Sequence, residues 1–104
     1  MEKVIRDGKV AVLISQGFGA GWYSWNTEHQ ELLYHPQLVE IVEQNRANEI
    51  DEDWVKENLK IEDVSCRGAS DLKIHWLPVG TVFEVDEYDG AESLRTLADF
   101  VLVA

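Results

Sequence analysis

The feature that most constrains the fold is a continuous apolar run, residues 10–14, that leads directly into a glycine-rich loop. A run of this kind predicts a central strand that is covered on both faces. In the loop, glycine occupies every second position from 17 to 21, and three large aromatic side chains follow within the next four residues. Glycine opens backbone conformations closed to other residues and lets a ligand or another segment approach the main chain closely. We therefore expect the chain to be organised around residues 16–26.

Turn signals and alternating patterns predict further strands. Asp-Gly pairs at positions 7–8 and 89–90 are strong short-range signals for a hairpin between antiparallel strands. Apolar residues alternate with polar ones in two later stretches, which is typical of half-buried strands. The strands expected besides the central one are residues 4–5, 72–76, 81–88, 91–96 and 100–103.

Helix signals are confined to the middle of the chain. Thr27 and Gln30 have the spacing of a capping box, which predicts a short helix that ends before His35 and Pro36. Pro36 can open a second helix, and Asp51 can cap a third. The sequence therefore predicts an α+β fold: a mostly antiparallel sheet of about five strands with two or three helices inserted mid-chain.

The composition fits one globular domain, residues 1–104. Hydrophobic residues make up 45% of the chain, and no apolar run approaches the about 20 residues of a membrane-spanning helix. The first seven residues include four charged ones and lack the apolar stretch of a secretory signal. The single cysteine, Cys66, cannot form an internal disulfide, which is typical of a reducing compartment. We expect a cytoplasmic protein with no membrane partner.

The chain carries 20 acidic and 9 basic side chains, for a formal net charge of −11. Such a surface repels nucleic acid unless its few cations gather on one face, so a nucleic-acid partner is not expected. The charge could serve solubility alone, or it could attract a basic protein surface or imitate DNA. The acidic residues expected on the helices are Glu40, Glu43, Glu49, Asp51, Glu52 and Asp53.

The glycine-rich loop is the leading candidate for a ligand site. It matches neither the dinucleotide fingerprint, whose third glycine is replaced by a tryptophan, nor the phosphate-binding P-loop. Its backbone N–H groups could still meet an anion beside rings that stack on a base. Alternatively, the glycines permit a sharp turn and the aromatic side chains pack against the sheet. Nearby arginines could neutralise an anionic ligand, although Arg67 could instead be an ordinary surface residue that pairs with Asp71. The candidate ligand-binding residues are Gly17, Phe18, Gly19, Ala20, Gly21, Trp22, Tyr23, Trp25, Arg67, Arg6 and Arg95.

Catalytic and metal-binding patterns find little support. Arg67 next to Cys66 could lower the pKa of the thiol, but a reactive cysteine would also need a histidine within reach. His29, His35 and His75 are scattered, and neither a zinc motif nor a calcium loop is present. We predict no catalytic residue, no metal site and no cofactor.

Three segments together resemble a family of small uncharacterised proteins that bacteriophages and prophages encode. They read VAVLISQGFGAGWYSWN at residues 10–26, GASDL at 68–72 and WLPVGTVFEVDEYDGAES at 76–93. The family carries no established activity, so the resemblance transfers no catalytic residue. It implies a context: small phage proteins without enzymatic motifs often inhibit host defence, either by binding a host protein or as oligomeric sponges for nucleotide immune signals.

The sequence and this resemblance lead to one main hypothesis with two alternatives. The main one is a non-catalytic, homo-oligomeric phage protein that sequesters a small anionic ligand, such as a nucleotide signal, in the cytoplasm of an infected bacterium. The first alternative is an acidic inhibitor or DNA mimic that docks on a host defence protein. The second is a small hydrolase or transferase that uses Cys66.

Overall fold

The computed structural model of the chain describes residues 1–97 and confirms the α+β prediction. These 97 residues form five antiparallel strands and two α-helices, with short 3₁₀ turns between them. The main difference from the expected strands is that they form a three-stranded and a two-stranded sheet rather than one sheet. The apolar stretch at residues 100–103, predicted to be a strand, lies outside the described residues.

The three-stranded sheet has the order β1 (Ile5–Arg6), β2 (Lys9–Ser15) and β3 (Leu72–Pro78). Strand β2 pairs with β3 along its full length. The turn before β2 has positive φ at both central residues, 51° at Asp7 and 75° at Gly8, as a type I′ hairpin turn requires. The first predicted hairpin is therefore confirmed.

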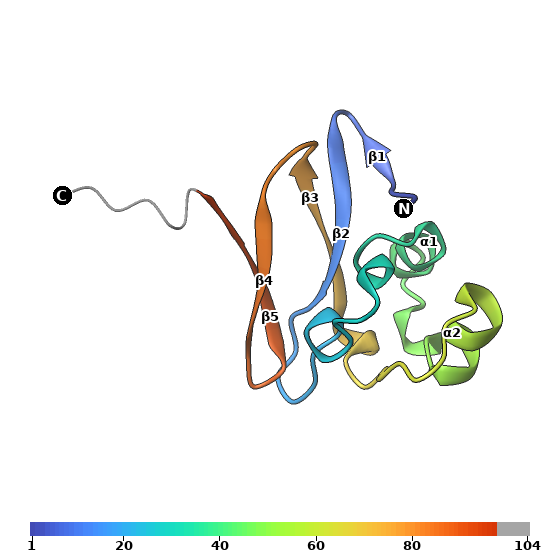
Figure 1. The fold of residues 1–104 in the computed structure, drawn as a ribbon. Coiled ribbons are helices and arrows are strands. Elements are labelled where there is room, and N and C mark those ends of the chain that lie inside the picture. The colour runs from blue at the N-terminus through green and yellow to red at the C-terminus, as the bar shows by residue number, and fades with distance from the viewer. Residues whose placement is uncertain (98–104) are drawn as a thin grey trace.

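The two-stranded sheet is a hairpin of β4 (Phe83–Tyr88) and β5 (Ala91–Thr96). Its turn repeats the same geometry, with φ of 49° at Asp89 and 86° at Gly90. Figure 1 shows this hairpin on one side of β2 and β3, with both α-helices on the other side.

Strand β2 is buried on both faces, as its continuous apolar run predicts. Ala11 and Leu13 belong to a core shared with the helices, which we call the helix-side core. Val12 belongs to a second core, the hairpin-side core, against which Phe83 of β4 and Leu94 of β5 pack. The alternation of side chains along one strand thus places β2 between two layers.

Both predicted α-helix starts are confirmed. Helix α1 (Pro36–Glu43) begins at a proline, and the Nδ1 atom of His35 accepts a hydrogen bond from the N–H of Gln37 at 3.2 Å. Helix α2 (Glu52–Leu59) is capped by Asp51, whose carboxylate accepts from the N–H of Trp54 at 2.8 Å. None of the helices in the described part of the chain is long and apolar enough to cross a membrane.

The helix predicted from Thr27 is instead a 3₁₀ turn, η2 (Gln30–Leu33). Leu32 packs in the helix-side core and Leu33 in the hairpin-side core, so the segment bridges two layers instead of presenting one apolar face. Pro36 keeps His35 out of the helical conformation, with φ −54° and ψ 126°, so the 3₁₀ turn does not continue into α1. The other 3₁₀ turns are η1 (Tyr23–Trp25), η3 (Ala47–Glu49) and η4 (Ala69–Asp71).

The β4–β5 turn packs against the glycine-rich loop, and this contact generates a prediction. Gly90 and Gly80 have nearly the same φ, 86° and 88°, but a Cβ at Gly90 would overlap the backbone of Ala20, whereas at Gly80 it would meet open space. We expect Gly80→Ala to lower the free energy of unfolding by about 1–2 kcal/mol through backbone strain. Gly90→Ala should cost about 1–3 kcal/mol more, because the overlap adds to the strain. Urea unfolding followed by tryptophan fluorescence measures both. Equal losses would mean that the turn does not pack on the loop.

Candidate functional site

A buried carboxylate, that of Glu92 on β5, holds the glycine-rich loop in place. The side chain is 3% exposed and accepts four hydrogen bonds. The backbone N–H groups of Ser15, Trp22 and Ser24 donate to it at 2.8, 2.9 and 2.7 Å, and the hydroxyl of Ser24 donates at 2.6 Å. Hydrogen bonds to a charged group are stronger than those between neutral groups. The main chain around the loop therefore does meet an anion, and the anion is part of the protein.

Sequence reasoning missed Glu92, although a signal was present. Glu92 alternates with Leu94 on β5, and Leu94 packs in the hairpin-side core. An acidic residue at an inward position of a strand needs hydrogen-bond donors, because a buried charge without partners is costly. A strand position of this kind indicates a carboxylate that is bonded inside the fold.

The aromatic residues of the loop divide into interior and exterior ones. Trp22 is fully buried, and its indole N–H donates to the carbonyl of Leu32 at 2.9 Å. The stacking role proposed for Trp22 is therefore wrong, since its ring fills the core. Trp25 and Phe18 are 41% and 72% exposed, and Tyr23 is half-buried and packs against both cores.

The glycines of the loop allow other segments of the chain to approach closely. A Cβ at Gly17 would overlap the side chain of Asp71, and one at Gly21 would overlap Ser24 and the ring of Trp25. The N–H of Gly19 donates to the carbonyl of Asp89 at 2.5 Å. These contacts favour the alternative in which the glycines serve the fold, and the N–H of Gly19 is already bonded within it.

The three arginines of the predicted site are not brought together. Arg67 lies beside the loop, because the next residue, Gly68, packs against the carbonyls of Ala20 and Gly21. Arg95 is 3.7 Å from the carboxylates of Glu84 and Asp86.

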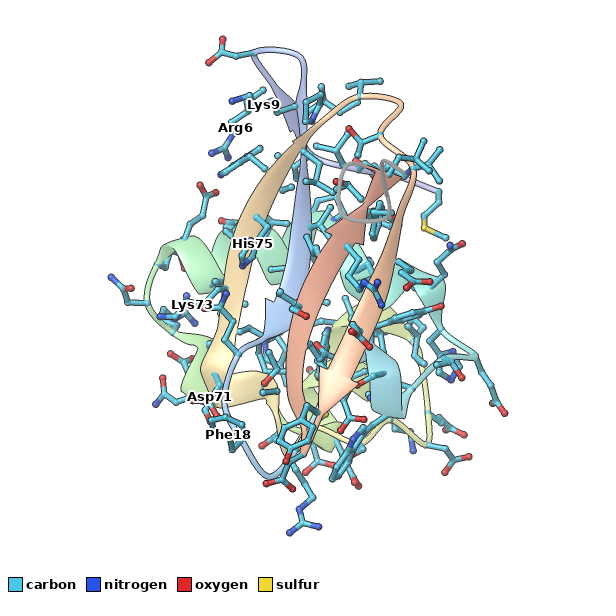
Figure 2. The ribbon with its side chains drawn as sticks, turned by 90° about the vertical axis from the view of Figure 1, so that its left-hand side faces the viewer. Arg6, Lys9, Phe18, Asp71, Lys73 and His75 are labelled. Carbon is cyan, nitrogen blue, oxygen red and sulfur yellow. The ribbon has the colours of Figure 1, made fainter. Side chains whose placement is uncertain are left out.

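Arg6 is held far from the loop. Figure 2 shows Arg6 and Lys9 toward one end of the three-stranded sheet and Phe18 and Asp71 toward the other, with Lys73 and His75 between them. Arg6 donates two hydrogen bonds to Glu43, at 2.6 and 2.9 Å, and its guanidinium is 5.3 Å from the ring centroid of Trp76. The predicted grouping of Arg6 with the loop is therefore wrong for a single copy of the chain.

A groove with aromatic walls opens at the other end of the hairpin. The cavity has a volume of about 490 Å³ and lies between β4 and the two 3₁₀ turns that follow the loop. Tyr23, Tyr34 and Phe83 contribute its rings, and Gln30 and Glu84 contribute polar groups. We call this cavity the aromatic groove. Burial raises the pKa of Tyr34 above its ordinary value, so the phenol stays neutral.

The candidate catalytic residues lie in unsuitable surroundings. Burial, with a smaller contribution from Glu52 and Asp51, raises the pKa of Cys66 to about 11, which is the opposite of the lowering expected from Arg67. Burial also lowers the pKa of His35, which favours the neutral ring that caps α1. Within residues 1–97, no group of three His, Cys, Asp or Glu side chains could hold a metal ion.

Four of the six acidic residues predicted on the helices have hydrogen-bond partners within the chain, and Glu40 accepts one from Gln44. Glu43 bonds to Arg6, Glu49 bonds to Arg46 at 2.7 Å, and Asp51 caps α2. The hydrogen bond from Arg6 lowers the pKa of Glu43, and that from Arg46 lowers the pKa of Glu49. This leaves a smaller free acidic surface than the alternative of a DNA mimic assumes.

Comparisons with protein-family models, curated proteins and solved structures found no match to this chain.

The Glu92 interaction generates a stability prediction. We expect Glu92→Gln to lower the free energy of unfolding by about 3–5 kcal/mol, because the amide loses the charge and turns an N–H₂ group toward backbone donors. The control is Glu84→Gln on the same hairpin, whose carboxylate is exposed and 3.7 Å from Arg95. It should change stability by no more than about 1 kcal/mol. Chemical denaturation of both variants provides the measurement, and a similar small loss in the two would contradict the structural role of Glu92.

Proposed function

We propose that this chain is a non-catalytic binding protein that takes up a small nucleotide-like ligand in the aromatic groove. The observation that carries the proposal is the set of three rings, from Tyr23, Tyr34 and Phe83, around one open cavity of about 490 Å³. This volume lies within the roughly 300–1,000 Å³ range of small-molecule sites.

The chemistry of the groove suits a planar, partly polar ligand. Aromatic side chains stack on nucleobases at about 1–3 kcal/mol per base, with little regard to which base is present. The amide of Gln30 offers both a donor and an acceptor to the edge of a ring. The nine described residues that line the cavity include no cysteine, histidine or serine, and the hydroxyl of Thr81 donates to the carbonyl of Pro78 at 2.7 Å rather than to a base. This composition favours binding over catalysis.

The proposed biological role combines this groove with the resemblance of three segments to small phage and prophage proteins. In that role the chain acts in an infected bacterium, where it sequesters a nucleotide immune signal and so inhibits host defence. A homo-oligomer belongs to the proposal, because a subunit boundary would deepen a groove that is open in a single copy.

Binding to nucleotides tests the proposal. Isothermal titration calorimetry with mononucleotides, cyclic di- and trinucleotides and cyclic ADP-ribose isomers should find at least one ligand with a dissociation constant of tens of micromolar or tighter. Tyr23→Leu and Phe83→Leu should each weaken it about ten-fold, since each removes one stacking ring and keeps apolar volume.

The matched control is Phe18→Leu, which removes a ring that is 72% exposed and outside the groove. It should leave the affinity unchanged. If no compound binds, or if Phe18→Leu weakens binding as much as Phe83→Leu does, the groove is not the ligand site.

A further inference from the structure

A smaller cavity of about 180 Å³ adjoins the aromatic groove. The two share Tyr34, Thr81 and Phe83, so a ligand could extend from one into the other. The smaller cavity reaches Lys3 near the start of the chain. A cation therefore stands in a cavity that shares the rings of Tyr34 and Phe83 with the aromatic groove.

Lys3 is positioned by an aromatic contact and keeps its hydrogen-bond donors available. Its ammonium group is 4.5 Å from the ring centroid of Tyr34, within the range of a cation–π interaction. Among residues 1–97, no carboxylate forms an ion pair with it. An ammonium carries three N–H donors, and a ring face satisfies its charge without accepting them all.

Within the described part of the chain, the two cavities offer a single cation to an anionic ligand. Lys3 is the only lysine or arginine among the described residues that line the two cavities. The remaining charged residue is Glu84, whose carboxylate lies at the far part of the aromatic groove, 3.7 Å from Arg95. A ligand with one anion suits this arrangement, because within residues 1–97 no second lysine or arginine lines either cavity to bind a further phosphate.

We propose that Lys3 binds the single phosphate of a nucleotide whose base lies in the aromatic groove. This inference rests on the proposed function and adds the position and the number of charges that the site recognises. Phosphate bound here accepts hydrogen bonds from the ammonium of Lys3 above the ring of Tyr34, and a second phosphate gains nothing.

Calorimetry with adenosine, AMP and ADP, and with the matching uridine compounds, tests this at low ionic strength, where a partly exposed ion pair is least screened. The wild-type chain should bind each monophosphate about five-fold more tightly than its nucleoside. The diphosphate should bind no more tightly than the monophosphate. Lys3→Gln should abolish the difference between nucleoside and monophosphate and leave nucleoside binding unchanged.

The control is Lys9→Gln, which removes an exposed lysine that lines neither cavity. It should preserve the preference for the monophosphate. If nucleosides bind but the phosphate adds no affinity, or if Lys3→Gln keeps the preference, the role of Lys3 is overturned while the aromatic groove stands. If neither nucleosides nor nucleotides bind, both proposals fall.

Discussion

The structure depends on four hydrogen bonds to one buried carboxylate. Glu92 lies 77 positions along the chain from Ser15, and it joins the end of β2, the loop and η1 to the hairpin. These contacts concentrate at the turn end of the hairpin, where Gly19 also bonds to Asp89 and Gly90 packs on Ala20. A charge removed from water is stable only when donors surround it, so the loop conformation and the burial of Glu92 require each other.

The same arrangement explains where a ligand site can form. The β4–β5 hairpin is fastened to the loop at its turn end. Because it belongs to a separate sheet, no ladder of backbone hydrogen bonds among the described residues joins its other end, at Phe83, to the three-stranded sheet. The aromatic groove and its adjoining cavity lie at that end. The loop supports the groove indirectly: it buries Trp22, and the next residue, Tyr23, contributes a ring to the wall.

The parts of the fold that local chemistry decides could be predicted from the sequence. The two Asp-Gly turns, the start of α1 at Pro36 and the cap of α2 at Asp51 each depend on a few adjacent residues. Other features depend on contacts between segments far apart in the chain, which composition and spacing do not specify. They are the division of the strands into two sheets, the N–H groups that donate to Glu92, and the aromatic groove. The loop shows the difficulty best. Its glycines and rings indicated a binding site, and its main chain does bind an anion, but no local pattern showed that the anion is Glu92.

Amide hydrogen exchange at Ser15, Trp22 and Ser24, followed by NMR, tests the central claim most directly, because these three N–H groups donate to Glu92. If the carboxylate holds them, all three should exchange only through global unfolding, as slowly as the amides in the middle of β2. Exchange at the rate of an exposed loop, while the β2 amides remain protected, would show that the loop is not fastened to Glu92 and that its main chain is open to a ligand.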